Sequence, residues 1–474
     1  MTGTQWLTLA VLLTVSFTLA VDFSILNVAL PVIGQDVGFA LDHLQWIGTS
    51  FALCAAGFTL LFGRIADLFG RRRLFLCGMA LLGVASLVGG LAQEPTMLIV
   101  ARVAQGLATA MVTPAALSLL TTSFPEGPRR AKALGLNGSL MAAGFTTGAI
   151  LGGVLTDLLS WRWAFFINVA VAIVVLIVAP LVLVESRPKT RPRLDVPGAV
   201  TVTLGLLVIV FGLTTAGETS WSTPRAWGPM LLGVALLAVF VVIETRVPEP
   251  LIPVALLRRR TVAWGNFAGL LAFATETSLV FLLTLYLQNV LGLTPLAAGL
   301  SFAVLGAGTV IGGLIGPRVI GRVGSKTAMV IGLLVQAAAT IPLAFLGAGS
   351  GAITLLLVAT FAGGVANLIA IIGFMVTATS GMPDHEQGLA TGLATMSQQV
   401  GITVGIPIMS TIVTWRMHSL GAQTPTAELS GITTAITVNA ALCVVAALAV
   451  GVFLRGEEPP LASGDPDREL APAD

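Results

Sequence analysis

The chain has 474 residues, of which 56% are apolar and only 10% charged, and its mean hydropathy is +0.96. An average soluble protein carries about 25% charged residues, so this composition excludes a soluble domain. The net charge of +2 is small, and the distribution of charge among the loops carries more information than its sum.

Apolar windows of about 20 residues, the length that crosses a bilayer, predict fourteen membrane spans. The first, at residues 5–33, is too long for a cleaved signal peptide, lacks a basic N-terminal region and carries Asp22. The others are expected at residues 44–63, 74–92, 97–121, 132–156, 162–184, 196–216, 227–244, 262–289, 295–316, 327–347, 352–378, 389–414 and 433–454.

Basic residues alternate from loop to loop. Of the 24 Lys and Arg residues, 20 fall on one side of the predicted membrane, and Arg162, Arg225 and Arg416 fall on the other, while Arg102 lies inside a span. Because basic loops remain in the cytoplasm, we expect a multi-pass protein of the cell inner (cytoplasmic) membrane with both termini cytoplasmic.

Glycines recur at a nearly constant offset. Gly70 and Gly78 return 254 residues later as Gly324 and Gly332, and Gly144 and Gly148 return 257 residues later as Gly401 and Gly405. The repeat predicts an all-α integral membrane protein of two six-helix bundles plus two inserted helices. The expected units are an N-terminal bundle at 1–184, an inserted pair with linkers at 185–261, a C-terminal bundle at 262–455 and a disordered cytoplasmic tail at 456–474.

Two carboxyl groups lie deep within predicted spans, Asp22 and Glu276. A charge at the bilayer centre costs about 2.5–3.5 kcal/mol, so such residues face a cavity or a partner. The 254-residue offset carries Asp22 onto Glu276, and we expect the two acids to face each other across a central cavity. Burial favours a protonated carboxyl group and a nearby cation favours the ionised form, so a proton and a cationic substrate would compete there. The alternative is a neutral, hydrogen-bonded acid that holds helices together.

Arg102 opens a span and is followed one turn later by Gln105. At a rise of about 1.5 Å per residue, Arg102 lies near the depth of Asn27, and its side chain is expected to reach Asp22 in one conformational state. The alternative is an arginine that extends to the membrane surface. Asn27, Arg102 and Gln105 are therefore assigned with both acids to a proton-coupling and substrate cavity.

A short segment between two spans combines glycine, aspartate and arginine. Gly63, Asp67 and Gly70 are followed by Arg71 and Arg72. Asp67 is expected at a helix end, where it can pair with an arginine or with a helix N-terminus in one state only, which predicts a cytoplasmic gating loop. The alternative is that the arginines only set the membrane topology. That alternative would not explain Asp67 or the glycines.

Small residues also form one face of the span at 132–156. Glycines spaced by four permit close contact between helices, so a helix-packing motif is expected at Gly144, Gly148, Gly152 and Gly153.

Other chemistry is poorly supported. His43, His385 and His418 lack the spacing of metal ligands, and the three cysteines lie far apart in apolar segments, where buried thiols are expected. The stretch at 324–327 resembles the end of a phosphate-binding loop but lacks the preceding strand. We expect no metal, no cofactor, no nucleic-acid partner and no enzymatic activity.

Four of these segments resemble the signatures of a known family. The loop at 63–74, Arg102 with Gln105-Gly106, and the glycine face resemble three motifs of the major facilitator superfamily of membrane transporters. The stretch at 19–31 looks like the first-span signature of its fourteen-span drug:proton antiporter family. The resemblance implies proton-driven export of hydrophobic or cationic drugs or antibiotics by alternating access, with Asp22, Arg102 and Asp67 in coupling and gating.

Alternatives remain open within this resemblance. Ala149 stands where the family usually has proline after Gly148, so strict antiport and uniport both remain possible. A lipid, glycolipid or natural-product transporter and a proton-coupled importer fit the same fold. A non-transporting receptor is disfavoured by the two intramembrane acids. The expected partners are a small hydrophobic or cationic substrate, protons and membrane lipids, with the chain acting as a monomer.

Overall fold

The computed structural model of the chain is built from helices. It describes residues 3–39, 43–124, 128–185, 195–218, 223–247, 250, 259–347, 349, 351–379, 387–421 and 424–454. The long helices in these ranges are α1 (Gly3–Val37), α2 (Gln45–Phe69), α3 (Arg71–Gly90), α4 (Pro95–Ser123), α5 (Pro128–Leu158), α6 (Trp163–Val182), α7 (Val196–Glu218), α8 (Pro224–Glu244), α10 (Arg260–Leu285), α11 (Pro295–Val323), α12 (Ser325–Thr340), α13 (Gly351–Thr379), α14 (Gln387–Ser419) and α15 (Pro425–Phe453). A π-helical turn, η2 (Tyr286–Val290), extends α10, and a 3-10 turn, η3 (Ile341–Phe345), extends α12. The predicted tail at 456–474 lies outside the described residues.

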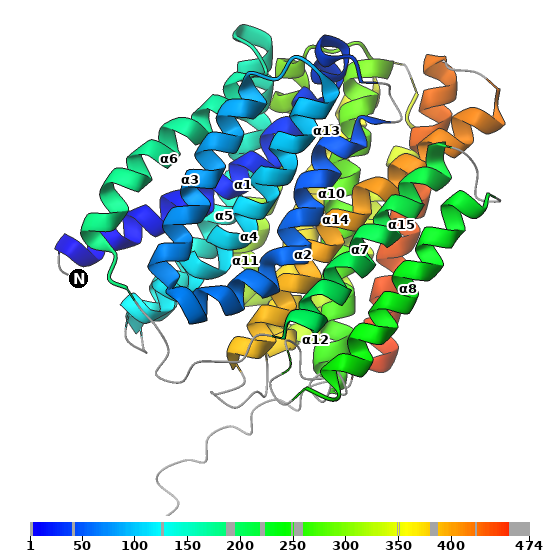
Figure 1. Cartoon of the computed structure of the whole chain (residues 1–474). Coiled ribbons are helices and arrows are strands. Elements are labelled where there is room, and N and C mark those ends of the chain that lie inside the picture. The colour runs from blue at the N-terminus through cyan, green and yellow to red at the C-terminus, as the bar shows by residue number, and fades with distance from the viewer. Residues whose placement is uncertain are drawn as a thin grey trace, which may run out of the picture.

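The helices form two halves with the same internal pairing. In the N-terminal half, α1 packs on α5, α2 on α4, and α3 on α4 and α6. In the C-terminal half, α10 packs on α14, α11 on α13, and α12 on α13 and α15. Figure 1 shows the long helices running side by side in one bundle. Matching partners in matching order are what an internal repeat produces.

Two helices stand outside this pairing. α7 and α8 pack chiefly on each other, and α7 also contacts α2 of the N-terminal half and α14 of the C-terminal half. Figure 1 shows α7 beside α14, with α8 on its outer side. The pair is therefore attached to both halves at once.

Twelve of the described helices are long and apolar enough to cross a membrane. Neither α2 nor α5 is among them; the apolar part of α5 within the described residues is the shorter stretch Ala143–Leu158. The chain is thus a multi-pass membrane protein, with twelve candidate spans in its described part where fourteen were expected in the whole.

The apolar core is distributed unevenly along the bundle. One buried cluster joins both halves through residues such as Ile33 and Leu44 from the first and Leu283 and Phe302 from the second. Two others each belong to one half and lie near the α2–α3 and α11–α12 junctions. We call the end that holds these two junctions the arginine-rich end. The cluster that joins the halves lies toward the opposite end.

Candidate functional site

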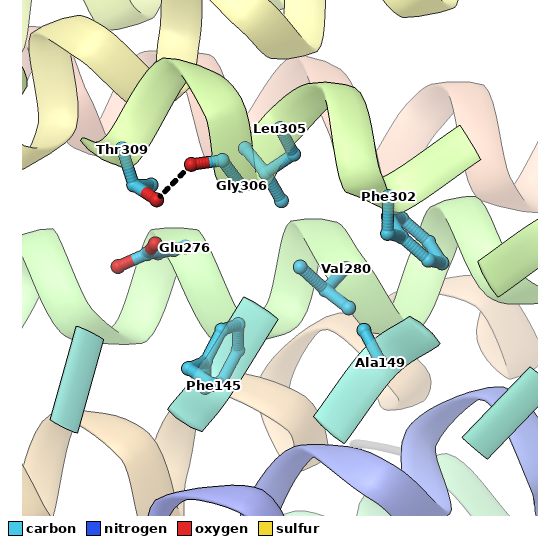
Figure 2. A pocket seen from close by; sticks show the side chains of 8 residues that line it. All are labelled: Phe145, Ala149, Glu276, Val280, Phe302, Leu305, Gly306 and Thr309. Atoms are coloured by element: carbon cyan, nitrogen blue, oxygen red, sulfur yellow. Dashed lines mark hydrogen bonds between the residues drawn. The ribbon is translucent and has the colours of Figure 1, made fainter. Parts of the chain in front are cut away.

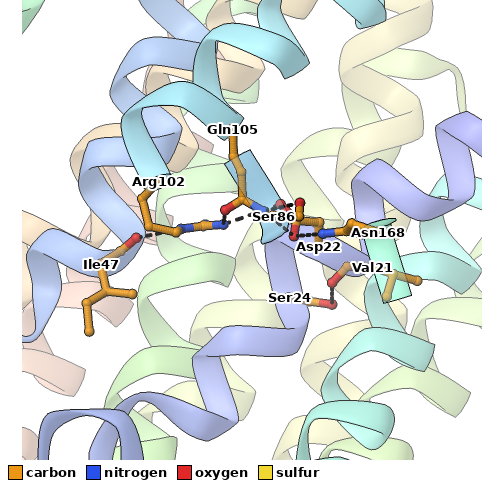
Figure 3. Close-up of polar contacts among 8 residues, drawn as sticks. All are labelled: Val21, Asp22, Ser24, Ile47, Ser86, Arg102, Gln105 and Asn168. Atoms are coloured by element: carbon orange, nitrogen blue, oxygen red, sulfur yellow. Dashed lines mark hydrogen bonds and ion pairs between the residues drawn. The ribbon is translucent and has the colours of Figure 1, made fainter. Parts of the chain in front are cut away.

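Asp22 lies inside the N-terminal half. Its side chain is 1% exposed, and Oδ2 is 3.3 Å from Nη1 of Arg102 (Figure 3). Oδ1 accepts a hydrogen bond from Nδ2 of Asn168 on α6, and Nε2 of Gln105 lies 3.5 Å from the same oxygen. The carboxylate therefore connects α1 with α4 and α6.

Arg102 is as deeply buried as its partner, at 1% exposed. Its Nη1 donates to Oε1 of Gln105 at 2.8 Å, and its Nε donates to the carbonyl oxygen of Ile47 at 2.9 Å. The guanidinium also lies 4.2 Å from the ring centroid of Phe51. Gln105 in turn donates to Oγ of Ser86 at 2.8 Å. A single charged network thus connects five helices, α1, α2, α3, α4 and α6.

The sequence predicted part of this network. Arg102 was expected to reach Asp22, and the structure places them in contact together with Gln105. Asn168 was missed, although a single asparagine within the apolar run of α6 is a signal that could have found it. The side chain of Asn27 lies outside what the structure describes.

Glu276 lies elsewhere, in a pocket between α5, α10 and α11. A small space is bordered by its side chain together with Phe145 and Ala149 of α5 and Phe302 and Thr309 of α11 (Figure 2). The carboxyl group also borders a second small space that extends toward α12 and α13. No Lys, Arg or His lines either space in the described part of the chain. The pocket therefore presents a carboxyl group without a resident cation on its lining.

The prediction that Asp22 and Glu276 face each other across one cavity is wrong in this structure. A Cβ on Gly148 of α5 would lie 2.7 Å from the carbonyl oxygen of Val21, and one on Gly405 of α14 would lie against Ala274. Gly148 and Gly405 are equivalent in the repeat, so Val21 on α1 is equivalent to Ala274 on α10. The offset between these two helices is therefore 253 residues, not 254. One residue turns a side chain by about 100° around a helix, so the two acids point in different directions.

The corrected offset pairs Asp22 with Thr275, which lies in a neutral counterpart of the charged network. Nε2 of Gln336 donates to Oγ1 of Thr275 at 3.3 Å, and Nδ2 of Asn439 donates to its carbonyl oxygen at 2.9 Å. Asn439 of α15 thus occupies the place that Asn168 of α6 has in the other half. In the residues described, the buried ion pair belongs to the N-terminal network alone.

The same offset pairs Glu276 with Phe23, which packs on a small apolar cluster that joins Phe51 of α2 with Ile402 of α14. The Phe23 ring lies 6.2 Å from that of Phe145 and 6.1 Å from that of Phe51, measured between centroids. Phe51 contacts the Arg102 guanidinium and Phe145 lines the Glu276 pocket. Three aromatic rings therefore form a continuous contact from the charged network to the pocket.

The predicted gating loop is bonded to the C-terminal end of α6 and to Glu185, three residues beyond that helix. The backbone N–H of Arg72 donates to Oε1 of Glu185 at 3.1 Å, and Nη2 of Arg72 donates to the carbonyl oxygen of Pro180 at 2.7 Å. Arg71 begins α3, and Gly63 lies one helical turn before Asp67 in α2. The side chain of Asp67 lies outside the described residues. The role of Asp67 therefore stays a prediction.

Gly70→Ala tests the tight packing of this loop. Gly70 has φ +110°, and a Cβ there would lie 2.6 Å from Oε1 of Glu185. We expect a loss of about 1–3 kcal/mol from backbone strain and a further loss from displacement of Glu185. The control is Gly324→Ala, at φ +81° with nothing within 4 Å of a Cβ. Thermal unfolding in detergent measures both, and equal losses would contradict a role for the Glu185 contact.

The glycines of α5 lie directly against backbone. Cβ atoms on Gly144 and Gly148 would lie within 2.8 Å of carbonyl oxygens of α1, and Gly152 meets the carbonyl of Ile25. Gly153 faces the other half, where its Cβ would lie 2.5 Å from the carbonyl oxygen of Pro295 on α11. This glycine face thus brings α5 against α1 and against α11.

Two expectations about reactive side chains can be compared with the structure. In the ranges described, no three His, Cys, Asp or Glu side chains form a group that could hold a metal ion. All three cysteines are free: Cys54 and Cys443 are buried as expected, whereas Cys77 is exposed.

Comparison with known proteins identifies the family. Residues 12–406 match the family described as Major Facilitator Superfamily. The chain belongs to the major facilitator superfamily. Members of this superfamily are membrane transporters, and the chain is a transporter rather than an enzyme.

Relatives in this superfamily carry names that refer to antibiotics. The chain is 37% identical to the cephamycin export protein CmcT of Amycolatopsis lactamdurans, over 87% of this chain and 85% of that protein. It is 35% identical to the puromycin resistance protein pur8 of Streptomyces alboniger, over 95% and 89%. A solved structure of a bacterial homologue of the lysosomal transporter Spinster aligns over 97% of this chain and 100% of that one, with a TM-score of 0.64 and 17% identity, which supports the fold alone.

Proposed function

We propose that the protein is a proton-coupled exporter of hydrophobic or cationic drugs or antibiotics across the cytoplasmic membrane. The observation that carries the proposal is the enclosed Asp22–Arg102 pair, found in a chain whose relatives are named for antibiotic export or resistance. The arginine-rich end faces the cytoplasm in this proposal, because basic loops remain on that side. With α2 and α5 also crossing the membrane, the chain has fourteen spans and both termini are cytoplasmic.

Proton coupling follows from the two charge states of Asp22. With Asp22 ionised, Arg102 has an anionic partner and α1 is held to α2 and α4. A proton on Asp22 removes that partner and leaves Arg102 with the neutral acceptors Gln105 and Ile47. Because a buried charge without a partner is costly, protonation destabilises this arrangement. Protonation thereby favours a different packing of α1, which is the two-state element that alternating access needs.

Glu276 supplies the substrate side of the proposal. Its pocket lies between the halves and is lined mainly by apolar and aromatic side chains, with the hydroxyl of Thr309 nearby. An apolar wall with one anionic group suits a hydrophobic cation. The aromatic contacts through Phe145, Phe23 and Phe51 connect that pocket to Arg102. Through these contacts, an occupied pocket would influence the charged network.

Glu276→Gln is expected to reduce export of cations selectively. Loss of one ionic contact of about 1.4 kcal/mol lowers the apparent affinity for ethidium about tenfold, while transport of an uncharged antibiotic changes little. The matched control is Glu428→Gln, because Glu428 on α15 bonds to Asn289 and borders neither space at Glu276. Equal losses for charged and uncharged substrates would contradict a cation-recognition role.

The function itself is tested in bacteria that lack their own drug exporters. Cells that produce the wild-type protein are compared with cells that produce Asp22→Asn, across puromycin, a cephamycin and ethidium. We expect raised resistance to at least one compound with the wild type only. If both proteins accumulate in the membrane and neither changes resistance or drug accumulation, drug export is contradicted and a lipid or natural-product substrate is favoured.

A further inference from the structure

The inserted helix α7 is hydrogen-bonded to both halves. Oγ1 of Thr203 on α7 donates to the carbonyl oxygen of Gly57 on α2 at 2.6 Å. Oγ1 of Thr411 on α14 donates to the carbonyl oxygen of Leu213 on α7 at 2.9 Å. The missing side chain of Gly57 lets the helices approach, because a Cβ there would lie 3.1 Å from Thr203. α7 therefore lies along the line where α2 and α14 meet.

The internal repeat makes a second line of contact equivalent to this one. α2 corresponds to α11 and α5 corresponds to α14, so the α2–α14 seam and the α5–α11 seam are related by the repeat. Among the described helices, α7 and α8 pack on neither α5 nor α11 to a comparable extent. The inserted pair thus covers the α2–α14 seam and leaves the equivalent α5–α11 seam uncovered.

Side-chain exposure reflects the same difference. The described large apolar side chains of α2 are buried or half-buried, except for Phe69 at the helix end. Its counterpart α11 exposes a band of them along its length: Leu300, Val310, Ile311, Leu314, Ile315 and Val323. In a membrane protein this band faces lipid. The α5–α11 seam therefore borders the bilayer directly.

The Glu276 pocket lies behind the uncovered seam. Toward one end the seam is closed by backbone contact, since a Cβ on Gly299 would lie 2.8 Å from the carbonyl oxygen of Ala149. Farther along α11, the seam widens into the space bordered by Phe145 and Thr309 (Figure 2). Val310 follows Thr309, lies one helical turn after the pocket residue Gly306 and is 48% exposed.

We propose that α7 and α8 seal one lateral seam of the transporter, and that substrate dissolved in the bilayer enters the Glu276 pocket through the other, between α5 and α11. The class of substrate is amphiphilic, with an apolar body that partitions into lipid and a cationic group that pairs with Glu276. The inference rests on the proposed function and adds a route to it. It also assigns a role to the inserted pair, which is to make lateral access one-sided.

The test compares two neighbouring substitutions on α11. Val310 and Ile311 have similar exposure, 48% and 41%, and similar depth, but they point about 100° apart around the helix. Val310→Trp places a bulky ring at the seam, and Ile311→Trp places it in lipid. In proteoliposomes we expect Val310→Trp to raise the KM for ethidium about tenfold through steric exclusion, with Ile311→Trp near the wild type. Equal KM values for the two variants would overturn the route.

A second measurement needs no transported substrate. Thr309→Cys places a thiol in the pocket, and Ala55→Cys places one at the equivalent position of α2, both in a Cys77→Ser background because Cys77 is exposed. A maleimide dissolved in the bilayer should label Cys at 309 about tenfold faster than at 55, because only the first is accessible from lipid. Equal labelling would overturn the route. Preferential labelling at 309 without ethidium transport by the wild type would contradict the drug-export proposal and leave the route supported.

Discussion

Asp22→Asn is expected to abolish proton-driven drug transport. Asparagine keeps the shape of the side chain but cannot exchange a proton, so the network loses the group whose charge distinguishes its two states. Coupled efflux should fall about 100-fold or more, since a ligand that no longer discriminates between two states cannot shift their populations. Substrate binding should change little, because Asp22 lies in the N-terminal network and does not line the Glu276 pocket.

The same variant should also be less stable. Arg102 would remain 1% exposed without an anionic partner, and breaking a buried ion pair costs about 3–5 kcal/mol. The double variant Asp22→Asn, Arg102→Gln removes the unpaired charge and should recover much of the stability without recovering transport. Thermal unfolding and pH-driven efflux, measured on both variants, separate the two roles. Normal pumping by Asp22→Asn would contradict the coupling role. If the double variant recovered transport as well as stability, the Asp22–Arg102 pair would have a structural role only.

Gly148→Val is expected to disrupt the packing of α5 on α1. A Cβ at this position would lie 2.7 Å from the carbonyl oxygen of Val21 and would also meet Oγ of Ser24. That hydroxyl donates to the carbonyl oxygen of Phe145 at 2.7 Å, so the clash displaces an interhelical hydrogen bond as well as backbone. Overpacking of this kind costs about 3 kcal/mol. It would also shift Asp22, the next residue along α1.

The control for Gly148→Val is Gly321→Val on α11, where a Cβ would meet nothing within 4 Å. Both substitutions add the same side chain to a helical glycine, so propensity changes cancel in the comparison. The fraction of monodisperse protein after extraction and the unfolding temperature measure the effect. Equal behaviour of the two variants would contradict the claim that close α1–α5 approach depends on Gly148.

The sequence predicted the helical membrane fold and most of the charged network. Apolar length located the helices, glycine spacing revealed the repeat, and helical rise placed Arg102 within reach of Asp22. These inferences depend on properties averaged over many residues or on a long side chain that tolerates an error in position. They are therefore insensitive to the exact register of one helix against another.

The relation between the two acids depended on register and was predicted incorrectly. The sequence alignment of the two halves matched Asp22 with Glu276 because both are acids. The glycine contacts with Val21 and Ala274 show that the offset between α1 and α10 is one residue shorter. An apolar helix in a membrane has little polar patterning to mark which side is buried, so sequence alone did not fix the direction of either side chain. Nor did it show where α7 docks, because Thr203 and Gly57 belong to no motif that the sequence revealed.

The measurement that tests the central claim most directly is ethidium movement in proteoliposomes under an imposed pH gradient. The wild type should accumulate ethidium on the side with the higher proton concentration, reverse direction when the gradient is reversed, and lose this response in Asp22→Asn. Movement that follows the ethidium gradient alone, at the same rate with and without a pH gradient and in both proteins, would contradict proton-coupled export.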